Sequence, residues 1–267
     1  MIADLHIHTT ASDGKLTPVE AVLWAKSRAI DVMAITDHDS VGGLEEGSRA
    51  AKEAGIRFVN GIELSCYTVC EVHILGYNFD YHDAAFLQRL QDVKEMRRER
   101  NVLIGQKLAR LGVTPDIDFT AEGLGRMNIA RRLVEEGYVR DVSEAFERYL
   151  GVGGKAFAES RRLTPKSAVK MLKEAGAFCA IAHPKKFLLD GRLDLLVSGL
   201  KPEGLDGLEV NYPGHTDQDK AALSAMCKRY GLLPTGGSDY HGDEDKNFDF
   251  ELDPRTARRL LGKFEER

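Results

Sequence analysis

The sequence predicts an α/β fold built on a parallel sheet of seven strands. Seven short runs of apolar and β-branched residues recur along the chain, and helical patterns lie between most of them. Alternation of strands and helices favours parallel pairing, and in a closed barrel of this kind the loops at the carboxyl ends of the strands meet on one face. Each run also ends at, or carries, a histidine or an acidic residue. That face is therefore expected to collect ionisable side chains.

The predicted strands and helices follow one another in a regular order. The seven strands are residues 2–8, 32–38, 58–65, 71–77, 178–183, 207–212 and 234–241. The clearest helices begin after Thr17 and Thr164, which are suitable N-cap residues and are each followed by proline, a residue favoured at the first helical position. Glu20 lies three residues after Thr17, which is the spacing of a capping box.

Residues 80–157 break this order. A long helical pattern runs from about residue 84 to residue 111, and the stretches "AEGLGRMNIARRLVEEG" and "SEAFERYL" are also helical, with no convincing strand. We therefore expect residues 1–79 and 158–267 to form the barrel. Residues 80–157 would form a helical insertion.

The composition limits the class of protein and its partners. With 267 residues, 43% of them hydrophobic, the chain can bury one large core. A formal net charge of −5 gives no general attraction to a polyanion, which argues against long duplex nucleic acid as a partner. No apolar run is long enough to span a bilayer, and the first residues do not resemble a signal peptide. We expect a soluble, cytoplasmic protein that binds no membrane, and nothing in the sequence indicates an obligate protein partner.

The four cysteines, Cys66, Cys70, Cys179 and Cys227, are too few and too scattered for a disulfide framework. We interpret them as reduced thiols, most of them in the core.

Two histidines of the first strand, His6 and His8, are two residues apart. Side chains alternate in direction along a strand, so both rings point to the same side and can bind one ion together. Six of the eight histidines lie at or near predicted strand ends with four acidic residues: His6, His8, His38, His73, His183, His241, Asp13, Asp37, Glu63 and Asp239. A single strand histidine is usually a hydrogen-bonded core residue, but so many groups brought together without a cation would leave buried polar atoms unsatisfied. The pattern therefore predicts a metal centre.

The ligand types indicate which metals would bind. Imidazole and carboxylate groups without an obvious thiolate suit Mn, Fe or Zn better than Ca, and we expect Mn. The number of candidate ligands exceeds what one tetrahedral zinc ion needs. A cluster of two or three divalent ions is therefore predicted.

Six motifs, in their order and spacing, resemble those of a known family. "DLHIHTTASDG", "AITDHDS", "GIELS", "HILGY", "IAHP" and "GSDYHG" look like the motifs of the polymerase and histidinol phosphatase (PHP) family of metal-dependent phosphoesterases. The match covers nearly the whole chain. The resemblance implies a distorted seven-stranded (β/α)7 barrel with a trinuclear metal site.

The resemblance also implies which residues hold each ion. It places the first ion on His6, His8, Glu63 and Asp239, the second on Glu63, His73 and His183, and the third on Asp13, His38 and His241. Glu63 would bridge the first two ions, where a hydroxide nucleophile is expected.

Two acidic residues, Asp37 and Asp39, fall outside that set. We expect Asp37 to orient a ligand histidine as an outer hydrogen-bond acceptor. Asp39 could simply cap the following helix.

Specificity should come from residues that no metal motif uses. Residues 94–110 carry six basic and two acidic residues in a chain of net negative charge. Arg97 and Arg100 are three residues apart, share a helix face, and could clamp a second phosphate. Arg98 and Arg110 are expected on a solvated face.

The helical insertion and the stretches "GLEVNYPGHT" and "TGGSDYHG" resemble the PHP subgroup that hydrolyses nucleoside 3′,5′-bisphosphates and trims short oligonucleotides from the 5′ end. Those relatives usually have a histidine where "RMNIAR" has Asn128, and we expect Asn128 and Arg131 to contact substrate phosphate. His215, near a strand end, could contact substrate or act as a general acid. His82 is expected to be a surface residue.

Two alternatives to a nucleotide substrate stay open. Hydrolysis of histidinol phosphate or another small phosphomonoester would use the same ions without a nucleotide pocket. A non-enzymatic structural module usually requires loss of ligands, whereas every ligand position here carries a competent residue.

Overall fold

The computed structural model describes residues 1–68, 70–121, 123–158, 163–242, 254, 255, 257 and 258. Its contacts divide the chain into two compact units, a barrel unit of Met1–Arg89 and Leu163–Arg267 and a helical unit of Leu90–Arg162. The predicted insertion covered residues 80–157, and the contacts place the first boundary inside a long helix instead.

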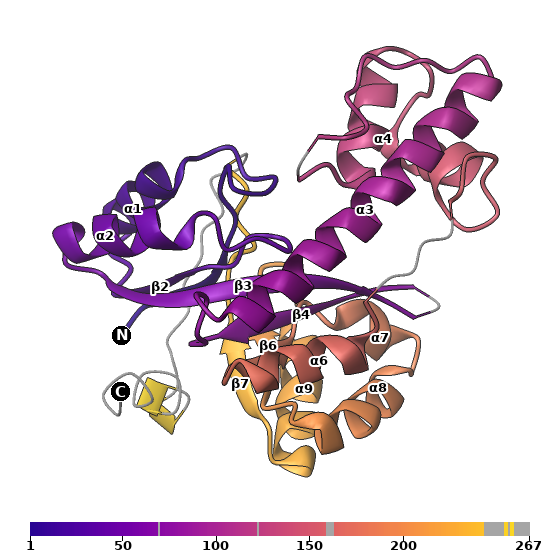
Figure 1. The fold of residues 1–267 in the computed structure, drawn as a ribbon. Helices are drawn as coiled ribbons and strands as arrows, with labels where there is room; N and C mark the ends of the chain where they lie inside the picture. Colours follow the sequence, from indigo (N-terminus) through magenta and orange to yellow (C-terminus); the bar gives the residue numbers. More distant parts are fainter. Residues whose placement is uncertain (69, 122, 159–162, 243–253, 256, 259–267) are drawn as a thin grey trace. The chain divides into compact units, whose positions relative to one another are not determined.

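The barrel unit is built on one seven-stranded sheet whose strands pair in chain order (Figure 1). The strands are β1 (Ala3–Ile7), β2 (Val32–Ile35), β3 (Arg57–Tyr67), β4 (Glu71–Tyr77), β5 (Phe178–Ile181), β6 (Gly207–Asn211) and β7 (Leu233–Gly236). An isolated bridge between Ile7 and Tyr240 joins the first strand to the segment after the last. The sheet is therefore a nearly closed barrel, and the predicted seven-stranded α/β barrel is confirmed.

The expectation of an all-parallel sheet is wrong at one strand. Strand β4 runs antiparallel to both β3 and β5, while the other neighbouring pairs are parallel. Only three residues separate the end of β3 at Tyr67 from the start of β4 at Glu71. A parallel crossover needs a dozen or more residues, so a connection this short forces a hairpin.

The helices of the barrel unit lie between its strands in the sequence. They are α1 (Pro18–Ser27), α2 (Leu44–Ala54), α6 (Pro165–Glu174), α7 (Lys185–Leu189), α8 (Leu193–Leu200), the 3₁₀ turn η2 (Lys201–Glu203) and α9 (Asp217–Tyr230). Both predicted N-caps are confirmed, because Thr17 accepts a hydrogen bond from the Glu20 amide and Thr164 accepts one from the Ser167 amide. The Glu20 carboxylate accepts a bond from the Thr17 amide in return, which completes the capping box.

Alternate residues of five strands form a buried apolar cluster, which includes Leu5, Val59, Leu75, Tyr77 and Phe178. The Tyr77 hydroxyl donates to the Leu5 carbonyl at 2.9 Å, so the one polar group of this tyrosine is satisfied inside the cluster. Burial of these side chains holds the strands together.

A bulge in β1 decides where its histidines point. Ala3 and Asp4 pair with consecutive residues of β2, but the pairing then shifts so that β1 contains one extra residue before Ile7. A bulge lets neighbouring residues turn toward the same side of a sheet. Leu5 can therefore pack in the apolar cluster while the next side chain, His6, approaches the carboxylate of Glu63.

The helical unit contains most of α3 (Ala84–Arg110) together with α4 (Arg126–Glu135), α5 (Val142–Ala145) and the π-helix η1 (Phe146–Leu150). Its own core includes Ile104, Leu108, Ile129 and Leu133. The described residues of this unit include no strand, as the sequence predicted. Among the described parts of both units, no helix is long and apolar enough to cross a membrane.

Candidate functional site

Glu63 of β3 lies at the centre of a cluster of histidines in the barrel unit. The side chain is fully buried. Five imidazole nitrogens lie within 3.3 Å of its oxygens: His73 Nδ1 at 3.0 Å, His183 Nε2 at 3.1 Å, His6 Nε2 at 3.3 Å, His38 Nδ1 at 3.0 Å and His8 Nε2 at 3.3 Å. One carboxylate is therefore shared by side chains from β1 and the residue after it, from β4, and from the loops after β2 and β5.

Two further carboxylates lie beside these histidines. Asp239 Oδ1 is 3.2 Å from His8 Nε2 and 3.5 Å from His6 Nε2. Asp13 Oδ1 is 3.3 Å from His241 Nε2 and 3.7 Å from His8 Nδ1. The ring of His8 thus lies between the two aspartates.

The structure brings all nine predicted ligand side chains into this one region. Three groups have ligand atoms within 4.8 Å of one another: His6, His8, Glu63 and Asp239; His8, Asp13, His38 and His241; and His38, Glu63 and His73. The first group has the same members as the set implied for the first ion. In the third group His38 takes the place expected for His183, whose ring contacts Glu63 and lies 5.1 Å from the His73 ring.

The donor set fits divalent ions. Four buried ligand atoms have no hydrogen-bond partner within the described ranges: His6 Nε2, His8 Nδ1, His8 Nε2 and Glu63 Oε2. Buried polar atoms without partners are costly in a folded protein, whereas bound cations would use their lone pairs. Imidazole and carboxylate donors suit transition metals such as Mn, Fe or Zn.

The same carboxylates control the protonation of the histidines. Burial lowers the pKa of His8, but the carboxylates of Asp239 and Glu63 beside its ring outweigh this effect and raise the pKa from 6.5 to about 9. Burial likewise opposes a charge on His6, and the carboxylates of Glu209 and Glu63 raise the pKa of His6 well above its usual value. The histidines in turn hold the pKa of Glu63 well below its usual value, against the effect of burial. The cluster is therefore strongly charged, and protons and metal ions compete for the same nitrogens.

Glu209 of β6 is a site residue that the sequence analysis missed. It is fully buried, and its Oε1 accepts a hydrogen bond from His6 Nδ1 at 2.9 Å. Its Oε2 accepts from the backbone amide of His183 at 2.6 Å. A carboxylate on one ring nitrogen fixes the tautomer that leaves the other nitrogen free for a metal. The signal was an acidic residue inside the buried run "GLEVNY".

The structure gives Asp37 other partners than the histidine we expected. Its carboxylate accepts hydrogen bonds from the amide and hydroxyl of Thr9, both at 2.7 Å, and from the Ser12 hydroxyl at 2.6 Å. No ligand histidine is among the described hydrogen-bond partners of this carboxylate. Asp37 therefore holds the loop between His8 and Asp13 in place.

The helix cap proposed for Asp39 is wrong. The following helix, α2, has Gly43 as its N-cap residue and no side-chain capping bond. Asp39 Oδ1 instead accepts from the Ser65 amide at 2.9 Å, which ties the loop after β2 to β3.

Two predicted ligands adopt strained backbone conformations, and a glycine allows a close approach. His183 and Asp239 have φ angles of 27° and 53°, a region that side chains other than glycine rarely adopt. A Cβ atom on Gly237 would lie 2.2 Å from His6 Cβ. The segment between β7 and Asp239 can therefore pass beside β1 only because residue 237 is glycine.

His215 lies near the end of β6 but is poorly suited to act as an acid. Its Nδ1 donates to the Val210 carbonyl at 2.8 Å, and its buried Nε2 has no partner among the described residues. Burial lowers the pKa of His215, which favours the neutral ring. A neutral ring with its proton on Nδ1 offers Nε2 as an acceptor, so a contact to substrate fits this geometry better than proton donation.

The predicted phosphate contacts lie in the helical unit. Arg97 is half-buried, Arg131 is exposed and Arg100 is only 7% exposed. Arg100 donates twice to Asn101 Oδ1, and Asn101 in turn donates to the Leu124 carbonyl. These bonds fix the Arg100 side chain within the helical unit.

Three other predicted residues of this region have surface or capping roles. Asn128 Oδ1 accepts from the Gly125 amide at 2.8 Å, so this atom caps α4 and the amide nitrogen is the group that can donate to a phosphate. Arg98 is exposed and lies 3.5 Å from Glu95, and Arg110 is exposed, as expected for a solvated face. In the barrel unit, His82 is also exposed.

Comparisons with known proteins identify what this chain is similar to. Residues 4–197 match the family model of the PHP domain. A 5′-3′ exoribonuclease of Haemophilus influenzae is 36% identical over 89% of both chains, and a 3′,5′-nucleoside bisphosphate phosphatase of Chromobacterium violaceum is 34% identical over 89% of this chain and 86% of the relative. A solved structure described as an amidohydrolase from C. violaceum, with bound sulfate and no metal, has a TM-score of 0.84 at 31% identity and covers 98% of this chain and 96% of its own.

Proposed function

The chain belongs to the PHP domain family, and from that premise we propose that it is a metal-dependent hydrolase of nucleotide phosphate esters. The preferred reaction converts a nucleoside 3′,5′-bisphosphate to the nucleoside 5′-monophosphate and phosphate, and the same site trims short oligonucleotides from the 5′ end. The observation that carries the proposal is the Glu63 cluster, in which five histidines surround one buried carboxylate. The names of the two relatives supply the substrate class.

The proposed centre holds two or three divalent ions, with Mn preferred over Fe or Zn. The ligands are His6, His8, Asp13, His38, Glu63, His73, His183, Asp239 and His241, with Glu63 shared between ions. The presence of three ligand groups supports a multinuclear centre, because Glu63 belongs to two of them and its two carboxylate oxygens could serve different ions.

The residues of the chain have separate tasks in this reaction. Bound divalent ions would supply a hydroxide nucleophile at neutral pH and neutralise charge on the phosphoryl group. Glu209 keeps His6 in the tautomer that presents Nε2, and Asp37 holds the loop that carries Asp13. The Tyr212 hydroxyl donates to Asp239 Oδ2 at 3.3 Å and orients that carboxylate. His215 offers an acceptor nitrogen to the substrate.

The helical unit would recognise the phosphate that is not cleaved. Arg97 and Arg100 lie on one face of α3, and arginine forms charge-assisted bidentate contacts with phosphate. The bonds between Arg100 and Asn101 pre-organise one of these guanidinium groups. Arg131 and the amide nitrogen of Asn128 are further proposed contacts, and the 80–157 insertion as a whole is proposed to cap the substrate.

We also propose that the protein is cytoplasmic and that its partners are small molecules. No disulfide joins Cys66, Cys70, Cys179 or Cys227 in the described part of the chain, which suits a reducing compartment. The proposed partner is a nucleotide or short oligonucleotide, and the net charge of −5 disfavours long duplex nucleic acid. No membrane or obligate protein partner is proposed.

One assay separates this function from the alternative of histidinol-phosphate hydrolysis. Protein reconstituted with Mn is incubated with adenosine 3′,5′-bisphosphate, a 5′-phosphorylated oligonucleotide or histidinol phosphate, and kcat/KM is measured for each. We expect the two nucleotide substrates to be hydrolysed most efficiently. Preference for histidinol phosphate would reject the proposal.

A further inference from the structure

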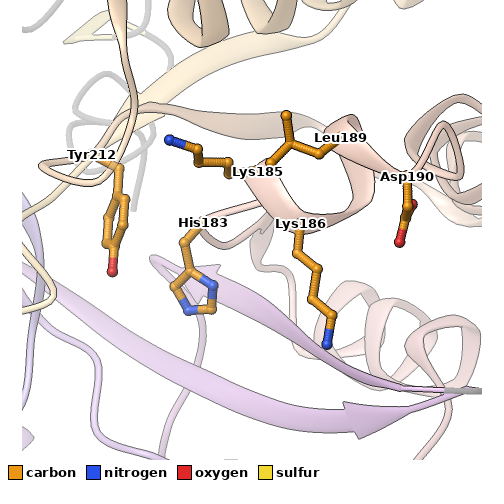
Figure 2. A pocket seen from close by; sticks show the side chains of 6 residues that line it. All are labelled: His183, Lys185, Lys186, Leu189, Asp190 and Tyr212. Atoms are coloured by element: carbon orange, nitrogen blue, oxygen red, sulfur yellow. The ribbon is translucent and has the colours of Figure 1, made fainter.

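A pocket of about 650 Å³ opens beside His183 in the barrel unit. Its lining residues are His183, Lys185, Lys186, Leu189, Asp190 and Tyr212 (Figure 2). Two of them also belong to the proposed centre, because His183 contacts Glu63 and Tyr212 donates to Asp239. The volume lies within the range of pockets that hold small ligands. A ligand in this pocket would therefore be a direct neighbour of a phosphate held at the centre.

The charges of the pocket leave one cation for a ligand. Lys185 pairs with Asp219 at 2.9 Å, and Asp190 binds the guanidinium of Arg192. The ammonium group of Lys186 interacts electrostatically with Asp190, but it makes no hydrogen bond or ion pair within the described ranges. Figure 2 shows the Lys186 side chain extending in the same direction as the rings of His183 and Tyr212. The pocket therefore has an available positive charge.

The remaining wall of the pocket is apolar. Leu189 is 71% exposed and contributes aliphatic surface to the pocket. The Tyr212 ring lies 5.6 Å from the His183 ring and supplies a flat surface to the same pocket. Aromatic and aliphatic surfaces of this kind accept the face of a nucleobase without reading its sequence.

We propose that this pocket binds the nucleotide on the 3′ side of the scissile bond when the substrate is an oligonucleotide. The base lies against Leu189 and Tyr212, and the next phosphodiester pairs with Lys186. This inference rests on the proposed function and extends it, because a nucleoside 3′,5′-bisphosphate has no nucleotide at that position. The pocket thus decides how well the protein uses oligonucleotides relative to bisphosphates.

The test compares two substrates that differ only in whether further nucleotides are attached to the scissile 3′ phosphate. We measure kcat/KM for adenosine 3′,5′-bisphosphate and for 5′-phosphorylated triadenylate with the wild-type protein and with Lys186→Ala, Lys186→Glu and Leu189→Asp. Both side chains are exposed, so the variants should fold, and their metal content is checked. Lys228→Ala is the matched control, because Lys228 is an exposed lysine in the last turn of α9.

We expect Lys186→Ala to lower kcat/KM for the oligonucleotide about two- to fivefold, the range of exposed charge pairs, and to leave the bisphosphate unchanged. Lys186→Glu and Leu189→Asp should cause larger losses on the oligonucleotide alone, because they place a negative charge beside phosphate, and high salt should reduce these losses. Equal losses on both substrates, or none with either, would overturn the subsite while leaving nucleotide hydrolysis in place. A wild-type protein that cleaves neither substrate would overturn the proposed function and the subsite together.

Discussion

Glu209 Oε1 accepts a hydrogen bond from His6 Nδ1 at 2.9 Å, and the other oxygen of the same carboxylate accepts from the amide of His183. One buried side chain on β6 thereby positions a residue of β1 and a residue of the loop after β5, both of which contact Glu63. Metal-binding histidines depend on such outer partners for their tautomer and orientation.

Replacement of this carboxylate should weaken metal binding more than it weakens folding. Glu209→Gln keeps the size of the side chain but can accept only one of the two hydrogen bonds and carries no charge. We expect the dissociation constant for Mn to rise about 10- to 100-fold, with activity recovered by excess Mn. A metal titration followed by activity measures both. Glu53→Gln, at an exposed position of α2, is the control, and an unchanged Mn affinity in Glu209→Gln would contradict the positioning role.

Glu63 and Asp37 should differ in how much activity their loss removes. Glu63→Ala deletes the carboxylate that five histidines share, whereas Asp37→Ala loosens the loop held through Thr9 and Ser12. We expect the loss in kcat/KM for Glu63→Ala to exceed that of Asp37→Ala by at least about tenfold. Similar, modest losses in the two variants would show that Glu63 does not bridge ions.

If Arg97 and Arg100 hold the phosphate that is not cleaved, their loss should change substrate preference. Arg97→Ala and Arg100→Ala should each lower kcat/KM for adenosine 3′,5′-bisphosphate by about 10- to 100-fold, because hydrogen bonds to charged groups contribute about 1.5–3 kcal/mol. Hydrolysis of a simple aryl phosphate, which has no second phosphate, should be nearly unchanged.

The Arg100 variant needs a check of its stability, and both variants need a control. Arg100 also bonds to Asn101, so the melting temperature of its variant must be measured with the kinetics. Arg98→Ala is the matched control, since Arg98 is exposed on the same helix. Equal losses on both substrates, or no loss on either, would show that Arg97 and Arg100 of α3 do not bind the second phosphate.

The pH dependence of stability should reverse when metal is removed. In the metal-free protein the pKa of His8 is raised from 6.5 to about 9, so its protonation stabilises the fold fully below pH 6.5 and less as the pH rises toward 9. Metal binding requires the deprotonated ring and favours higher pH. As the pH is raised from 6.5 to 9, the melting temperature of the protein in chelator should therefore fall. The affinity for Mn should rise over the same range. A melting temperature of the chelated protein that increases with pH would contradict this assignment.

Periodicity was sufficient to predict the strands and the two proline-headed helices, because these depend on local patterns of residues. The direction of β4 depends on the length of the turn between Tyr67 and Glu71, and the alternation of strands and helices did not reveal it. The bulge in β1 could not be predicted from the sequence either, since it arises from the pairing of β1 with β2. Topology was predictable in outline, and strand register required the structure.

The candidate ligands could be found in the sequence because imidazole and carboxylate groups at successive strand ends are chemically distinctive. The residues that support these ligands could not be found in the sequence. Glu209 resembles any acidic residue in a strand, and only the fold places it between His6 and His183. Asp37 and Asp39 acquire their partners Thr9, Ser12 and Ser65 through contacts between separate loops and strands.

The central claim is that one barrel face holds a multinuclear metal centre, and the number of bound ions tests it most directly. Purified protein is stripped with a chelator, reconstituted with Mn, separated from free metal and subjected to elemental analysis. The overlapping ligand groups at His8, His38 and Glu63 predict two or three Mn ions per chain. One ion per chain, or none, would contradict the account.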